Sequence, residues 1–337
     1  MRDSGQMMMM VHRGMLAAGI DVDAVYERLG YHAQQLELRN LRTPHAQQLL
    51  FWNCLEGVTG DPDIGLHLCR HLPHYRGEIL EYLVLSSRTF GDGLARASKY
   101  VRLLSDAIEI RLETGADTAC LKIRTSALGD APQARHTEIC VVYQMMRFAA
   151  SVTEHRATAQ RLSLHYPRHA PQAEYDTLFQ CPVTFGTPDA EIHFNPAILG
   201  WRSPHWDPDL LKLNEELANR RMAGLERQDL VHRIRALFAQ RLELERCELD
   251  DIAAELGMPA RRLRFELSRA GTTFSQLLNE FRFALSKRLL GTTGERIENI
   301  AYLTGFSEPS TFYRAFKRWS GKTPVQYRED QQAEADK

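Results

Sequence analysis

The last hundred residues contain a helical pattern with one apolar face and one basic face. Residues 297–301 have apolar side chains at helical spacing, Gly305 ends that pattern, and Pro309 opens the next one. On a helical wheel, one stripe of the second helix is apolar and consists of Phe312, Phe316 and Trp319. The opposite side carries hydroxyl and basic side chains, namely Ser310, Thr311, Arg314, Lys317 and Arg318. The pattern predicts a helix-turn-helix whose second helix recognises DNA.

The same arrangement occurs a second time, earlier in the chain. Residues 251–257 (DIAAELG) align with residues 299–305 (NIAYLTG), which makes an internal repeat. The helix predicted over 260–270 has an apolar stripe of Leu263, Leu267 and Ala270. Its other side carries Arg261, Arg262, Ser268 and Arg269. Two such units within one hundred residues indicate a DNA-binding domain rather than a generic helical domain.

A long helix is predicted between the two units. Residues 274–290 (FSQLLNEFRFALSKRLL) contain no Gly or Pro and are apolar along one side. As a helix this stretch is about 25 Å long. A rigid spacer of that length sets two recognition helices roughly one DNA turn, ~34 Å, apart on one side of the duplex. A single chain would then read two successive major grooves.

The first two hundred residues mix helical and alternating patterns. Helical spacing predicts helices over 22–29 (ending at Gly30), over 44–55 opened by Pro44, and over 77–87, 91–104, 134–153 and 173–179. Alternation predicts a hairpin of residues 107–112 and 119–124 around a turn at 115–117, and strands over 161–166, 183–185 and 191–194. The fold class expected is an α+β N-terminal domain, followed by an all-α DNA-binding domain with two helix-turn-helix motifs joined by a long helix.

A helix-like segment over 207–227 separates the two parts. Leu210, Leu213 and Leu217 share one stripe of it, and two readings remain open. The stripe is either a coiled-coil-like dimer contact or a surface packed on the helix's own domain. The predicted boundaries are an effector-binding and dimerisation domain at 7–206, a linker helix at 207–227 and a DNA-binding domain at 228–328.

Charge and composition refine this picture. Residues 226–328 hold 18 Lys and Arg and 13 Asp and Glu, so this stretch carries +5; since the whole chain carries −1, the rest carries −6. No apolar run approaches a membrane span and the first residues lack the apolar core of a signal peptide. The six cysteines are scattered without a CxxC pair, which fits a reducing compartment. We therefore expect a cytoplasmic protein with no membrane contact.

No motif in the chain indicates catalysis or a cofactor. There is no phosphate-binding glycine loop, no GxSxG and no HExxH. His67, His71 and His74 lie near Cys69, but only His67 and His71 share a helix face, so we expect surface or packing histidines and no metal. A DNA-repair methyl acceptor with a zinc-held cysteine would need clustered cysteine ligands, which this sequence does not have. An enzyme would need a nucleophile paired with a base, and no such motif occurs in the N-terminal half.

Both halves of the sequence resemble parts of a known protein family. Residues 248–328 are similar to the DNA-binding domain of AraC/XylS-type bacterial transcription regulators, most specifically in 300–328 (IAYLTGFSEPSTFYRAFKRWSGKTPVQYR) and in the connector 281–290. The N-terminal half resembles the effector-binding and dimerisation domain of the subgroup named for an arabinose-binding domain, through 83–107 and 179–186. The name of that domain does not imply that this protein binds arabinose.

The resemblance also implies which residues face DNA bases. They are Arg261, Arg264 and Phe265 in the first recognition helix and Pro309, Ser310, Thr311 and Arg314 in the second. This chain departs from the family twice, with Pro259 in place of a serine cap and Phe265 in place of a frequent arginine. Phe265 points toward DNA on the wheel, where it contacts a thymine methyl or tilts the helix. The full candidate set adds Arg262, Arg269, Lys317 and Arg318 as base or phosphate contacts.

Together these observations predict a sequence-specific DNA-binding transcription regulator. The resemblance implies a homodimer that binds double-stranded promoter DNA, responds to a small-molecule effector in its N-terminal domain and activates transcription with RNA polymerase. The alternative is a ligand-independent dimeric regulator whose N-terminal domain serves only oligomerisation or protein contacts. No catalytic residue and no cofactor is expected.

Overall fold

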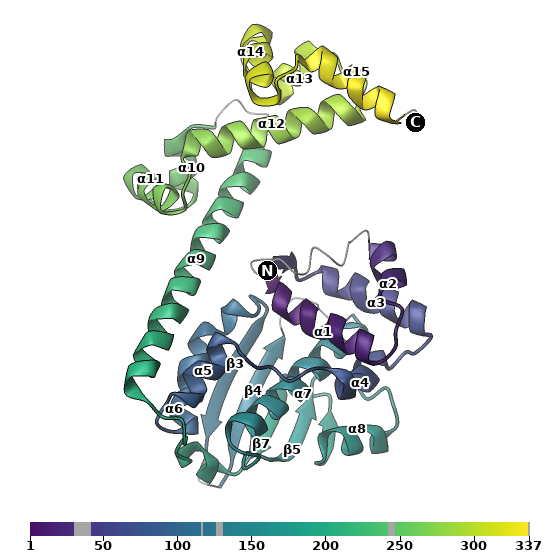
Figure 1. Ribbon diagram of the computed structural model, residues 1–337, viewed down its shortest axis with the longest axis vertical. Coiled ribbons are helices and arrows are strands. Elements are labelled where there is room, and N and C mark those ends of the chain that lie inside the picture. Colours follow the sequence, from purple (N-terminus) through teal and green to yellow (C-terminus); the bar gives the residue numbers. More distant parts are fainter. Residues whose placement is uncertain (30–41, 116, 126–130, 242–246, 336–337) are drawn as a thin grey trace. The chain divides into compact units, whose positions relative to one another are not determined.

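The computed structural model describes residues 1–29, 42–115, 117–125, 131–241 and 247–335 (Figure 1). Gly30 and one residue of the expected turn at 115–117 lie outside the described residues. The chain forms two compact units, Met1–Met222 and Ala223–Lys337. None of the described helices is long and apolar enough to cross a bilayer.

A five-stranded sheet organises the first unit, in the order β3-β4-β7-β5-β6. Its strands are β3 (Ile108–Thr114), β4 (Ala119–Thr125), β5 (Ala159–Leu164), β6 (Val183–Phe185) and β7 (Ala190–Phe194). The pairs are antiparallel except β5 with β6, which is parallel. The predicted hairpin is confirmed, with Ile108 opposite Thr125 and Thr114 opposite Ala119.

Helices surround this sheet, and most of them match the helical patterns of the sequence, whereas α1 (Gly5–Ala17) and α4 (Ile64–Leu68) were not predicted as separate helices. They are α1 (Gly5–Ala17), α2 (Val22–Leu29), α3 (Gln47–Thr59), α4 (Ile64–Leu68), α5 (Ile79–Leu85), α6 (Phe90–Ala97), α7 (Ala134–Val152) and α8 (Gln172–Phe179), with 3-10 helices η2 (Cys69–His71), η3 (Ser98–Leu103) and η4 (Pro196–Gly200). The long helix α7 packs on β5 and β7 and also contacts α3, α4 and α5. It therefore links the sheet to the N-terminal helices, as Figure 1 shows.

Two predicted helices begin or end elsewhere than expected. Pro44 does not open a helix, because it ends β2 (Arg42–Pro44), which pairs with β1 (Arg2–Ser4). A buried contact of 2.8 Å between His45 Nδ1 and Asp3 Oδ2 holds this pair, a partnership that no local pattern reveals. The helix expected over 91–104 ends at Ala97 and continues as η3. Directly after η3, the Leu104 carbonyl accepts a hydrogen bond of 2.7 Å from the Ser4 amide of β1.

The second unit is helical throughout. Its elements are the end of α9 (Pro208–Arg241), then α10 (Leu249–Glu255), α11 (Ala260–Arg269), α12 (Phe274–Thr292), α13 (Ile297–Leu303), α14 (Pro309–Ser320) and α15 (Pro324–Ala335). The helix expected to span 207–227 thus runs on to Arg241, because Leu230, Ile234 and Phe238 are buried in the core around α10 and α11.

Helix α12 is common to two separate cores of this unit. Its Leu277 is buried with α9, α10 and α11, whereas its Leu290 is buried with α13 and α14. Figure 1 shows α10 and α11 beside the start of α12, and α13 and α14 on its other side. The predicted spacer, α12, is therefore a structural helix. Each of its two halves packs against one helix-turn-helix and closes its core.

Candidate DNA interface and ligand cavity

The first recognition helix, α11, is anchored by two leucines. Its N-cap residue is Pro259, which makes no side-chain cap, so the helix depends on packing rather than on capping. Leu263 and Leu267 are fully buried in the core shared with α9 and α12. The side of α11 away from that core exposes the predicted residues Arg261, Arg262, Arg264, Phe265 and Arg269. The turn before it uses Gly257 at φ +68°, a left-handed conformation that favours glycine.

Phe265 is the unusual member of this surface. Its side chain is 60% exposed, although a phenylalanine in solvent gains nothing from hydrophobic burial. The Arg269 guanidinium lies 5.8 Å from the centre of its ring, a geometry in which the ring face attracts the cation. The pair therefore presents an apolar edge and a cation together at one end of the exposed face.

The second recognition helix, α14, repeats the arrangement with different chemistry. Pro309 occupies its first turn, where a missing N–H costs nothing. Phe312 and Phe316 are fully buried, so the opposite face is fixed outward and exposes Ser310, Thr311, Arg314, Lys317 and Arg318. Arg314 Nη2 lies 3.4 Å from Thr311 Oγ1. This face offers hydroxyls with cations, whereas α11 offers arginines around an aromatic ring.

Among the residues that the structure describes, the cations on both exposed faces have no carboxylate partner. Elsewhere in the unit, Arg235 pairs with Glu280 at 2.8 Å and Arg241 pairs with Glu255. Within the described residues, no ion pair engages the basic side chains of the two faces, namely Arg261, Arg262, Arg264, Arg269, Arg314, Lys317 and Arg318. Unpaired positive charge on a solvent-exposed face attracts a polyanion such as the DNA backbone.

One arginine inside the unit positions the second helix-turn-helix and was not singled out from the sequence. Arg282 of α12 donates from Nη2 to the Gly305 carbonyl at 2.8 Å, and its guanidinium lies 4.9 Å from the Phe306 ring centre. Burial lowers the pKa of Arg282. Gly305 is the left-handed residue of the turn between α13 and α14, with φ +76°. The contact therefore holds this turn against α12. The signal available in the sequence was an arginine inside the apolar connector.

The first unit contains an apolar cavity of about 140 Å³. It lies among residues of α1, α6, η3, β3, β4 and α7, including Met10, Leu94, Ile110 and Met145. A larger and more polar cavity of about 300 Å³ shares Leu94 and Met145 with it and is lined by Arg147 and Thr158. The sequence assigned no pocket residues, because these side chains read individually as ordinary core positions.

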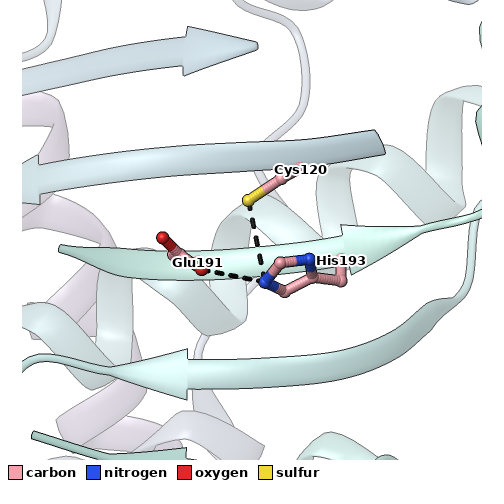
Figure 2. A group of neighbouring side chains, drawn as sticks. All are labelled: Cys120, Glu191 and His193. Carbon is pink, nitrogen blue, oxygen red and sulfur yellow. Dashed lines mark hydrogen bonds and ion pairs between the residues drawn. The ribbon is translucent and has the colours of Figure 1, made fainter. Parts of the chain in front are cut away.

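Three side chains on the sheet lie close enough to share a metal ion. Cys120 of β4 faces Glu191 and His193 of β7 (Figure 2). His193 Nε2 is 2.9 Å from Glu191 Oε2 and 3.8 Å from Cys120 Sγ. Two cations occupy the surroundings: Arg161 Nη2 is 3.2 Å from His193 Nδ1, and Lys122 Nζ is 3.7 Å from Glu191 Oε1.

This donor set fits a cross-strand polar network better than a metal centre. A divalent cation would be repelled by Arg161 and Lys122, and burial raises the pKa of the Cys120 thiol to about 11, whereas the thiolate is the form that binds metal. The other metal group considered from the sequence is dispersed in the structure. His67 contacts Asp61 and Glu174 at 2.6 and 2.8 Å, while Cys69 is buried and donates to the Gly65 carbonyl.

Comparison with known proteins defines the class to which this fold and surface belong. Residues 19–203, more than half of the chain, match the family described as the N-terminal arabinose-binding domain of AraC transcription regulators. Residues 252–330 match a helix-turn-helix domain family. The chain is a member of the AraC family, a DNA-binding transcription regulator that recognises double-stranded DNA through its helix-turn-helix domain. The prediction that it is not an enzyme is confirmed by this membership.

Individual relatives cover most of the chain. It is 29% identical over 314 residues to the ornithine utilization regulator of Pseudomonas aeruginosa, covering 92% of this chain and 91% of that protein. It is 25% identical over 273 residues to the regulator VirS of Mycobacterium tuberculosis, covering 79% and 78% respectively. Among solved structures, the transcriptional regulator CdpR from Pseudomonas aeruginosa has a TM-score of 0.45 and 20% identity, covering 92% of this chain and 98% of CdpR.

Proposed function

We propose that this regulator is a homodimeric transcription activator controlled by a small-molecule effector bound in its N-terminal domain. The observation that carries effector control is the apolar cavity of about 140 Å³ inside the first unit, because ligand sites are concave, mostly apolar and few per protein. We assign effector binding and dimerisation to residues 7–206, the linker helix to 207–227 and DNA binding to 228–328. The division into compact units at Met222 supports this assignment.

We assign base reading to both recognition helices. Arg261, Arg264 and Phe265 would read one major groove, and Pro309, Ser310, Thr311 and Arg314 the next. Arg262, Arg269, Lys317 and Arg318 would contact bases or phosphates beside them. The basic side chains among them are exposed and form no ion pair within the described residues, which supports this assignment, since arginine on guanine is the commonest specific base contact and Ser or Thr can bond to several bases.

We propose that the linker helix, through the leucine stripe of α9, adds a dimer contact to the N-terminal domain. Leu210, Leu213 and Leu217 are 52%, 59% and 36% exposed. A neighbouring face of the same helix packs on its own unit through Ala218, which is fully buried, and through an Arg96–Glu215 contact of 2.9 Å. Packing on its own unit thus uses the neighbouring face of the helix, and the exposed leucine stripe stays free for the dimer contact that we propose. A second copy of the same stripe is its natural partner, because a two-fold interface is self-complementary.

Leu213→Asp is expected to convert the protein from dimer to monomer, because a carboxylate would be buried without a partner in the interface. The mass measured by light scattering at micromolar concentration checks this, together with cooperative binding to DNA carrying two half-sites. Leu50→Asp is the matched control, since Leu50 is also 59% exposed but lies on α3. A Leu213→Asp protein that remains dimeric would contradict the proposed interface.

Effector control and activation are tested together with the full-length chain. A panel of sugars, amino acids and small apolar compounds is screened by thermal unfolding, in which a ligand at a hundred times its Kd adds about 2.7 kcal/mol of stability. We expect at least one stabilising compound to raise transcript yield from an operator-bearing promoter with purified RNA polymerase. If no compound shifts the unfolding transition, the ligand-independent reading of the N-terminal domain replaces this proposal.

A further inference from the structure

The chemistry of the apolar cavity restricts what it can bind. Among its lining residues no side chain is charged, and the polar ones are few, chiefly Ser98, Tyr75 and Gln144. A sugar or an amino acid would leave hydroxyl or charged groups without partners there, which is strongly unfavourable. The volume of about 140 Å³ is close to that of apolar cavities, about 150 Å³, that accept benzene. The cavity therefore suits a small, uncharged and largely apolar molecule.

Several lining side chains favour an aromatic ring over an alkyl chain. Met7, Met10 and Met145 bring three thioethers to the cavity wall, and methionine sulfur makes favourable contacts with aromatic rings. Tyr75 and Phe148 contribute two further rings, which contact each other edge to face at 5.9 Å between centres. A third ring bound beside this pair finds the offset and edge contacts that aromatic groups prefer.

Gln144 lines the cavity and has a buried side-chain atom that lacks a partner among the described residues. Its Nε2 donates to the Pro73 carbonyl at 3.1 Å, which fixes the amide orientation, since the flipped amide would place two oxygens together. Its Oε1 is buried and accepts no hydrogen bond from the described residues. A buried acceptor without a donor is destabilising, and a ligand that brings one donor removes that penalty.

We propose that this cavity binds a phenol-like ligand, one aromatic ring with a hydroxyl that donates to Gln144 Oε1. The inference rests on the effector control proposed above and names the chemical class of the effector. We do not assign this ligand to the adjoining cavity of about 300 Å³, because Gln144 is absent from its lining.

Two elements that line the cavity, α6 and η3, also contact α9, the helix of the proposed dimer contact. Leu94 and Ser98 line the cavity on α6 and η3. On the same elements, Arg96 contacts Glu215 of α9 at 2.9 Å, and the Tyr100 hydroxyl donates to Asn219 Oδ1 at 2.9 Å. A ligand that shifts α6 therefore moves residues that hold the start of α9, beside the leucine stripe.

The test uses the full-length chain and two probes of equal shape, phenol and toluene, whose methyl group replaces the hydroxyl. Calorimetric titration is expected to give phenol at least tenfold tighter binding than toluene. Gln144→Leu is expected to abolish that preference by weakening phenol alone. Gln172→Leu is the matched control, because its Nε2 also donates to a backbone carbonyl, that of Val183 at 2.9 Å, but Gln172 lies outside the cavity.

Each outcome bears on a different statement. Equal affinity of phenol and toluene for the unaltered chain, a measurement that needs no variant to fold, overturns the role of Gln144. Stabilisation by arabinose or lysine without binding of either aromatic probe overturns the ligand class while leaving effector control intact. Phenol binding that depends on Gln144 but leaves transcription unchanged supports the site and refutes effector control.

Discussion

Replacing Phe316 by alanine is expected to lower the free energy of unfolding of the DNA-binding unit by about 3–5 kcal/mol. The ring is fully buried and lies 5.5 Å from Phe283, 5.8 Å from Phe312 and 5.5 Å from Tyr327, measured between ring centres. These partners come from α12, α14 and α15, so the substitution opens a cavity where three helices meet. Typical domains are stable by only about 5–15 kcal/mol.

The effect is measured by urea unfolding of the full-length chain, with hydrogen exchange followed in α12, α14 and α15 to assign it to this unit. Phe265→Ala is the matched control, because the same atoms are removed from a ring that is 60% exposed. We expect Phe265→Ala to change stability by no more than about 0.5 kcal/mol. Comparable destabilisation by the two substitutions would show that Phe316 is not the centre of this core.

Arg314→Ala is expected to weaken binding to the operator by about 1–3 kcal/mol, roughly 5- to 150-fold. Arg314 is exposed on α14 and has no carboxylate partner among the described residues, so its guanidinium is available to a guanine edge. If it reads a base, the loss is confined to the preferred sequence and specificity relaxes at one position. Affinity for random DNA should stay nearly unchanged.

Competition binding over a salt series separates this role from simple charge loss. Arg235→Ala removes the same charge from an arginine of the same unit that is paired with Glu280, and it should affect operator binding little. Lys317→Ala should weaken all sequences alike and reduce the salt slope by about one, as expected for a phosphate contact. Equal loss of operator and random DNA in Arg314→Ala would make Arg314 a phosphate contact instead.

The two exposed faces differ in a way that bears on recognition. Helix α11 presents arginines around the exposed ring of Phe265, whereas α14 presents Ser310, Thr311 and Arg314. Arginine favours guanine, hydroxyls accept several partners, and an apolar ring suits a thymine methyl. We therefore infer that the two grooves are read through different contacts and that the half-site recognised by one chain is asymmetric.

The helical core of the second unit was predictable because its information is local. Stripes of apolar residues placed α11, α12 and α14, and Gly305 and Pro309 marked the turn between α13 and α14. By contrast, the strand pair β1–β2 joins residues about forty positions apart, and the periodicity around Pro44 carries no trace of it. Periodicity reports which side of an element is buried, but not what buries it.

What the sequence determined by itself was the doubled helix-turn-helix, the identity of its exposed basic side chains and the α+β character of the first half. Only the tertiary structure decided which face of α9 stays open. The leucine stripe of α9 is exposed, whereas the neighbouring face packs on its own unit. Arg282 contacts the turn at Gly305, and residues far apart in the sequence, such as Met10 and Gln144, line one cavity. The physical reason is that pairing, burial and cavity shape depend on contacts between distant residues, which a local pattern does not encode.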